Sequence, residues 1–117
     1  MKFSQALRFA LTGITTFFGS ETNGQIQLGV TATAVILGWI LQIDAMEWLV
    51  VVLCIIVVLT LEMINTAIEK LCDVVHPGYH PQIKIVKDIA AGAVLLAAVG
   101  SVTAGGIIFL PKIISFF

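Results

Sequence analysis

Two long stretches of this chain contain no charged residue, and they constrain its fold more than any other feature. They cover residues 22–43 and 89–110. Each is long enough for an α-helix to cross a bilayer core, which needs roughly 20 apolar residues. A third apolar stretch, 48–68, is broken only by Glu62 and Asn65. The sequence therefore predicts three membrane-spanning helices.

The composition also indicates a membrane protein. Hydrophobic residues make up 59% of the 117 residues, and the mean hydropathy of +1.09 is far above that of soluble domains. A chain of this length forms one domain at most. We therefore expect a single all-α membrane domain with spans at about 24–43, 47–72 and 83–111.

The first 18 residues have a helical period of apolar positions, which predicts an amphipathic helix at about 2–18 on the membrane surface. They contain neither a long apolar core nor a cleavage pattern, so they do not predict a removable signal peptide. Glycine, serine and asparagine at 19–24 predict a break before the first span. This break carries one carboxylate, Glu21.

The distribution of basic residues predicts the orientation. Lys2 and Arg8 precede the first span, and lysines flank the second connection, whereas the first connection carries only acidic residues. The N-terminus and the 70–88 loop should thus be cytoplasmic and the C-terminus outside, with Lys112 alone against the rule. The net charge of −1 predicts no nucleic-acid partner. Cys54 and Cys72 would lie roughly 27 Å apart on one helix, too far for a disulfide.

Four polar residues of the second span fall on one face. At about 100° per residue, Glu62, Asn65, Glu69 and Asp73 form a stripe that begins within the apolar segment. Ionisable groups in such places usually face a bundle interior and mark function, because hydrocarbon cannot solvate them. The alternative is a polar contact between helices without chemistry.

The third span opens with Lys84, Lys87 and Asp88 on one face at the cytoplasmic boundary. Its dense alanine and glycine content favours close helix packing and predicts that it lies inside a bundle. Before it, the 76–81 segment predicts a turn in which Tyr79 and His80 could lie beside a nucleotide. Zinc at the two histidines is disfavoured because no further ligand is near.

Together these residues suit phosphoryl transfer: carboxylates for Mg²⁺, lysines for the moving phosphoryl group, and a base for the attacking hydroxyl. Glu62 is the best base, since its charged form is disfavoured at the hydrocarbon edge. No P-loop or kinase glycine-rich loop is present.

Two motifs carry a family resemblance: Glu62-x-x-Asn65-Thr66-Ala67-Ile68-Glu69, and Lys87-Asp88-x-Ala90-Ala91-Gly92-Ala93-Val94-Leu95-Leu96. They resemble the signature of the small bacterial integral-membrane lipid kinases, the prokaryotic diacylglycerol kinase and undecaprenol kinase family. The similarity covers nearly the whole chain, including the position of Glu21.

The resemblance implies an ATP- and Mg²⁺-dependent kinase of the bacterial inner membrane, a homotrimer whose sites lie between subunits. Its implied acceptor is the hydroxyl of a membrane lipid, diacylglycerol or undecaprenol. The implied roles are as follows: Glu62 is the base, Asn65 orients it, Glu21 and Glu69 bind Mg²⁺, Lys87 holds the γ-phosphate with Asp88 in support, and Asp73, Tyr79 and His80 line the nucleotide end.

The chain departs from many members at Thr12, Thr22 and Gln25, where basic residues are common, so the resemblance does not carry phosphate or headgroup contacts over to this region. Two alternatives stay open: a small ion carrier with an acidic path, and a structural scaffold. An ion path needs polar groups through the whole membrane depth, yet the outer halves of the spans are almost wholly apolar.

Overall fold

A computed structural model describes residues 2–117, and these residues form four α-helices and no strand. The helices are α1 (Phe3–Ser20), α2 (Thr22–Ile40), α3 (Ala45–Val75) and α4 (Pro81–Phe116). The expected all-α fold is therefore confirmed. Each segment that the sequence predicts as helical corresponds to one of these helices, with ends that differ by a few residues.

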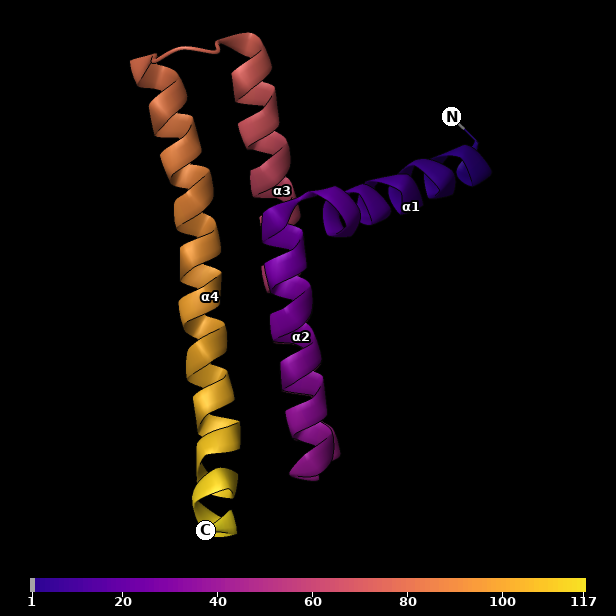
Figure 1. The fold of residues 1–117 in the computed structure, drawn as a ribbon, viewed down its shortest axis with the longest axis vertical. Coiled ribbons are helices and arrows are strands. Elements are labelled where there is room, and N and C mark those ends of the chain that lie inside the picture. Colours follow the sequence, from indigo (N-terminus) through magenta and orange to yellow (C-terminus); the bar gives the residue numbers. More distant parts are fainter. Residues whose placement is uncertain (1) are drawn as a thin grey trace.

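Three of the helices run side by side, and the first does not (Figure 1). α2 packs on α3, and α3 packs on α4. The end of α1 packs beside the beginning of α2, and the rest of α1 projects from the other helices at a steep angle. The N-terminus therefore lies away from them. This shape suits a surface helix attached to a group of spanning helices.

Within residues 2–117, two helices are long and apolar enough to cross a membrane by length and composition, namely α3 and α4. α2, for which the sequence also predicts a span, is not among them. Its first two turns contain Asn23, Gln25 and Gln27, which lower its hydropathy. The span predicted at about 24–43 therefore stays a prediction.

The junction between α1 and α2 is much shorter than the predicted break at 19–24. α1 continues to Ser20, and only Glu21 is extended (φ −96°, ψ 127°) before α2 begins. The expected loop was wrong: residues 22–24 begin α2, and Gly24 is a packing residue rather than a helix breaker. A Cβ on Gly24 would lie 2.2 Å from the carbonyl oxygen of Phe17, so the missing side chain lets the end of α1 cross closely over α2.

Replacing Gly24 by alanine is expected to destabilise the protein by about 1–3 kcal/mol, because the added methyl group overlaps backbone atoms that must shift. The matched control is Gly29→Ala in the same helix, where nothing lies within 4 Å of the new Cβ. Thermal unfolding in detergent micelles measures both. An unchanged melting temperature for Gly24→Ala would refute the close crossing.

The connection between α2 and α3 is a tight turn, as predicted. Gln42 has a φ of 53°, in the left-handed region that is uncommon for a non-glycine residue. Asp44 then caps α3 by accepting a hydrogen bond from the backbone N–H of Glu47, whose side chain accepts one from the Asp44 N–H. This capping box is why α3 begins at Ala45 rather than at about 47.

α3 and α4 are joined by residues 76–80, where the sequence predicts a turn.

α4 does not end at Pro111, as the predicted span boundary suggested, but continues to Phe116. Proline is tolerated within membrane helices when neighbouring groups satisfy the freed carbonyls. One turn of this extension pairs Lys112 with Glu47, with their Nζ and Oε1 atoms 3.3 Å apart. This partner for Lys112 was not foreseen.

Most of the surface of α4 has no partner within a single chain. Leu96, Val102 and Ile107 are each more than 70% exposed, and a Cβ on Gly92 or Gly100 would meet no atom within 4 Å. The predicted position of this helix inside a bundle is therefore not provided by one chain.

A candidate active site at the polar end of the helices

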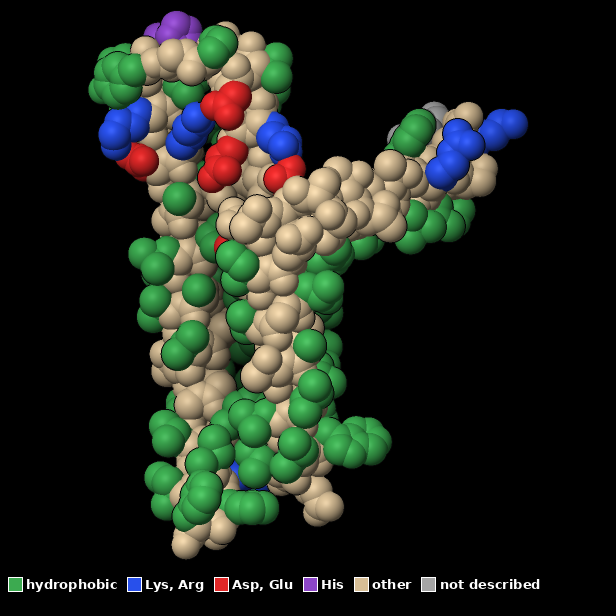
Figure 2. Space-filling model, in the orientation of Figure 1, with side chains coloured by type: hydrophobic (Ala, Val, Ile, Leu, Met, Phe, Trp, Pro, Cys, Tyr) green, Lys and Arg blue, Asp and Glu red, His purple; other side chains and the backbone are tan. Residues whose placement is uncertain are grey.

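Charged side chains of both signs gather at one end of the helical group, near the loop between α3 and α4 (Figure 2). The surface farther along the same helices is dominated by apolar side chains. The charged group comes from the last turns of α3, the first turns of α4 and the α1–α2 junction. Segments that are distant in sequence thus contribute to one polar region.

The stripe on α3 contains a hydrogen bond along the helix. Asn65 Nδ2 donates to Glu69 Oε1 at 3.0 Å, which shows that these two residues share a face. Asn65 is only 6% exposed, whereas Glu62 and Glu69 are half-buried and Asp73 is exposed. The polar stripe therefore runs from a buried region of α3 to its exposed end.

The predicted base, Glu62, has a partner on another helix. Gln27 Nε2 of α2 donates to Glu62 Oε1 at 3.5 Å, a long hydrogen bond between partly buried groups. Asn65, which the resemblance implied as the residue orienting this carboxylate, is instead bonded to Glu69. The structure thus assigns the contact with Glu62 to a glutamine that the sequence analysis did not single out.

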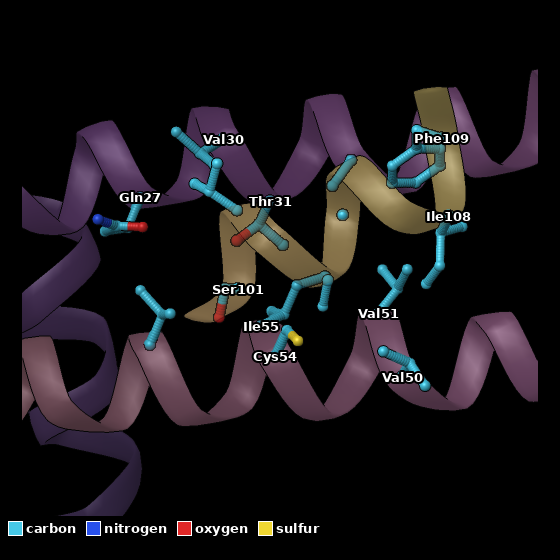
Figure 3. Close-up of a pocket in the computed structure, with 15 residues that line it drawn as sticks. Gln27, Val30, Thr31, Val50, Val51, Cys54, Ile55, Ser101, Ile108 and Phe109 are labelled. Atoms are coloured by element: carbon cyan, nitrogen blue, oxygen red, sulfur yellow. The ribbon is translucent and has the colours of Figure 1, made fainter. Parts of the chain in front are cut away.

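An apolar cavity begins beside this glutamine (Figure 3). Its volume is about 150 Å³, and it lies between α2, α3 and α4. Gln27 is at one end and Phe109 at the other. Most of its other lining residues are apolar, with the hydroxyls of Thr31 and Ser101 as exceptions. The carboxylate of Glu62 is therefore linked, through Gln27, to a space that favours hydrocarbon.

Glu21 lies beside the turn of α3 that carries the next acid of the stripe. Its Oε1 atom is 2.7 Å from Nζ of Lys70, the residue that follows Glu69. The one-residue junction between α1 and α2 thus brings Glu21 to the side chain of the residue that follows Glu69. Lys70 is another residue that the sequence analysis did not assign to the site.

α4 contributes two lysines with different partners. Lys87 Nζ lies 2.7 Å from Asp73 Oδ1 across the α3–α4 interface, whereas Lys84 pairs with Asp88 one turn farther along α4. The sequence placed Lys84 and Asp88 on one face, and this i, i+4 pair confirms it. The sequence offered no signal for the pair of Lys87 and Asp73, which joins two helices.

The loop side chains are exposed. Tyr79 is 77% exposed. His80 caps α4, since its Nδ1 atom accepts a hydrogen bond from the Gln82 N–H at 3.1 Å. The His76 ring lies edge-on to that of His80, with centroids 5.2 Å apart, and its Nε2 atom contacts the Tyr79 carbonyl oxygen. No group of three or more acidic, histidine or cysteine side chains that could hold a metal occurs within residues 2–117.

A magnesium site at Glu21 and Glu69 is compatible with this donor set. Mg²⁺ is usually held by one or two carboxylates, with substrate phosphates and water completing the shell. In each acid only Oε1 is engaged by another described residue, Lys70 for Glu21 and Asn65 for Glu69. Each acid thus keeps one carboxylate oxygen without a partner among residues 2–117, and oxygen is the ligand type that Mg²⁺ prefers.

Comparison with known proteins identifies the family. Residues 8–109 match the family described as prokaryotic diacylglycerol kinase. The chain is 36% identical over 112 residues to an undecaprenol kinase of Bacillus subtilis (strain 168), covering 96% of this chain and 91% of that protein.

It is also 36% identical over 111 residues to a diacylglycerol kinase of Synechocystis sp. (strain ATCC 27184 / PCC 6803 / Kazusa), covering 94% of this chain and 63% of that protein. Both relatives are kinases, as the motifs on α3 and α4 predict. The chain therefore belongs to the prokaryotic diacylglycerol kinase family and is a membrane lipid kinase.

Proposed function

We propose that this kinase transfers the γ-phosphate of ATP directly to the hydroxyl of a membrane lipid, either diacylglycerol or undecaprenol. The observation that carries the proposal is the position of Glu62. Its carboxylate contacts Gln27 at the end of an apolar cavity, while the stripe that it begins leads to Asp73 and its partner Lys87 at the polar end. A lipid hydroxyl and a nucleotide phosphate could meet between these two environments.

In the proposed reaction Glu62 is the general base. The lipid O–H bond breaks and its proton passes to the carboxylate of Glu62. The lipid oxygen forms a bond to the γ-phosphorus, and the bond from that phosphorus to the bridging oxygen breaks, so that ADP leaves. A positioned base contributes about 10²–10⁴-fold to such a step.

Lys87 holds the γ-phosphate in this proposal. Its ammonium group can leave its present partner Asp73 at little cost in free energy. Asp73 is exposed, and exposed ion pairs stabilise the folded state by only about 0–1 kcal/mol. Asp88 supports the same end through Lys84, and Asp73 with the loop residues Tyr79 and His80 lines the nucleotide.

Glu21 and Glu69 hold Mg²⁺ in this proposal, with Asn65 orienting Glu69 through its hydrogen bond. The ion would supply charge neutralisation at the phosphates of ATP.

Replacing Glu69 by alanine is expected to raise the Mg²⁺ concentration needed for half-maximal activity by about tenfold or more, since one of two protein ligands is lost. Activity is measured across a Mg²⁺ titration at fixed ATP. The control is Glu47→Ala, which removes an acid at the opposite end of the same helix, where it pairs with Lys112 and is not assigned to the site. An unchanged titration for Glu69→Ala would remove it from the ligand set.

α2 is the first of the three spans in the proposed topology. It runs alongside α3 and α4 in Figure 1, and its exposed side chains away from the cavity include Ile36, Trp39 and Ile40. The polar end with the N-terminus then faces the cytoplasm of a bacterial inner membrane, and α1 lies on the membrane surface. The ion pair of Lys112 with Glu47 favours this orientation, because it neutralises the lysine that contradicts the positive-inside rule.

The kinase assembles as a homotrimer in this proposal. The uncovered face of α4 supports an assembly of this kind, because its glycines leave room for a neighbouring helix. Active sites between subunits would place additional residues beside those described above.

An ion carrier is less well supported, because the cavity between the helices is lined mainly by apolar side chains rather than by a polar path. A scaffold without activity would leave the polar end without a role.

The test is transfer of labelled phosphate from ATP by the purified protein in mixed micelles with Mg²⁺. Diacylglycerol and undecaprenol are offered in parallel at equal mole fraction, and transfer to at least one is expected. A preference identifies the acceptor. If folded protein phosphorylates neither lipid, the proposed reaction is wrong.

A further inference from the structure

Thr66 is a buried polar residue of α3 that the proposed reaction does not use. The residue is only 9% exposed, and its Oγ1 atom has no hydrogen-bond partner among residues 2–117. The adjacent Asn65 is also buried, and its Oδ1 atom likewise lacks a partner there. Buried polar atoms are nearly always hydrogen-bonded in folded proteins, so two unpaired atoms on consecutive residues require an explanation.

Other threonines in these helices satisfy their hydroxyls locally. Thr60, on the same helix, donates to the carbonyl oxygen of Ile56 at 2.8 Å, and Thr33 and Thr103 make the same i−4 bond. Thr66 could donate in this way to the carbonyl of Glu62 but does not. Its hydroxyl therefore has an unused donor, which a ligand would reach once the side chains that cover it move aside.

The position of Thr66 places this hydroxyl near the proposed base. Four residues at about 100° each put Thr66 only about 40° around α3 from Glu62, on the same face and one turn along. Side chains of a helix lean toward its N-terminus. The N-terminus of α3 is at the end away from the loop, so Thr66 leans toward the turn of Glu62 rather than toward the exposed nucleotide end.

We propose that the Thr66 hydroxyl binds the acceptor lipid by donating a hydrogen bond to the oxygen of its alcohol group. The alcohol oxygen has two lone pairs, one of which attacks phosphorus while the other accepts from Thr66, and its proton is directed to Glu62. This inference rests on the proposed function, since it concerns the lipid that the kinase phosphorylates. It adds Thr66 to the site as a substrate-binding residue.

The test compares Thr66→Val with Thr66→Ser in the mixed-micelle assay. Valine has nearly the shape of threonine but no hydroxyl, whereas serine keeps the hydroxyl. Thr66→Val should lower kcat/KM for the lipid by about tenfold, as expected for one lost hydrogen bond, with the KM for ATP unchanged. Thr66→Ser should stay within about threefold of the wild type.

The stability of Thr66→Val provides a second readout, which should not fall although its activity does. Because valine removes a hydroxyl that has no partner, the melting temperature of Thr66→Val should equal or exceed that of the wild type. The matched control is Thr60→Val, which removes an exposed hydroxyl bonded to its own helix and should leave lipid kinetics unchanged. Should Thr66→Val fail to fold, Thr66→Ala removes the same hydroxyl and leaves a smaller side chain.

The outcomes separate this inference from the proposed function. Wild-type kinetics for the hydroxyl-deleting variants would overturn the role of Thr66 and leave the kinase reaction intact. A change confined to the KM for ATP would also overturn it, because the hydroxyl would then serve the nucleotide. Equal losses in Thr60→Val would show a general effect on α3 and overturn it as well. Absence of transfer by the wild-type protein would refute the reaction itself, and the inference with it.

Discussion

Replacement of Glu62 by glutamine is expected to reduce phosphate transfer by about 10²–10⁴-fold, the contribution of a positioned general base. Glutamine has nearly the same shape but cannot accept the proton of the lipid hydroxyl. Its amide can still form a hydrogen bond with Gln27, so the packing of α2 on α3 should remain. The loss should therefore be in kcat, with little change in the KM values for ATP and lipid.

The assay is initial-rate transfer at saturating ATP, with size-exclusion chromatography in detergent to show that the assembly is unchanged. Glu47→Gln is the matched control, since it makes the same chemical change on α3 at the opposite end, where Glu47 pairs with Lys112. The control should lose some stability through its capping box but keep its turnover. Retained activity in Glu62→Gln would mean that another group takes the proton.

Replacement of Lys87 by glutamine is expected to reduce kcat/KM by about 10²–10³-fold, the usual effect of losing one donor to charge that develops in the transition state. The side chain keeps a hydrogen-bond donor but loses the positive charge. Folding should be affected little, because the ion pair with Asp73 is partly exposed to solvent.

Lys84→Gln is the control for this prediction. Lys84 lies one turn earlier on α4, is 59% exposed and pairs with Asp88 rather than with α3. Its loss should change kcat/KM by only a few-fold. Equal defects in both variants would indicate a general electrostatic attraction of ATP to the polar end, and a specific role for Lys87 would be refuted. Measuring both at low and high salt separates these effects, because general attraction is screened by salt.

Several features of the site could be predicted because they depend on local helix geometry. Residues three or four apart on one helix are neighbours whatever the surroundings. The bond between Asn65 and Glu69 and the pair of Lys84 with Asp88 are both of this kind. The turn at 76–80 follows equally from local content, because Pro77 and Gly78 cannot easily extend α3.

The bends and ends of the helices were predicted less well, since they depend on contacts with other segments. Gly24 suggested a loop, yet it lies within α2, where the missing side chain lets Phe17 of α1 approach closely. Pro111 suggested the end of α4, yet the helix continues to Phe116. In both cases a residue type that often breaks helices is accommodated by its surroundings.

The sequence by itself determined that the chain is helical, that its longest segments are apolar enough to enter a membrane, and that one face of α3 is acidic. These properties follow from charge-free length and from the helical period, which need no information about neighbouring segments.

Only the tertiary structure decided which groups meet across helices. It pairs Glu62 with Gln27, Glu21 with Lys70, and Lys87 with Asp73. Helices that are apolar on nearly all sides carry little information about which face packs on which neighbour, so their relative rotation and level cannot be read from hydropathy. The partners of the site residues depend on that rotation and level, and they become known only when the helices are packed together.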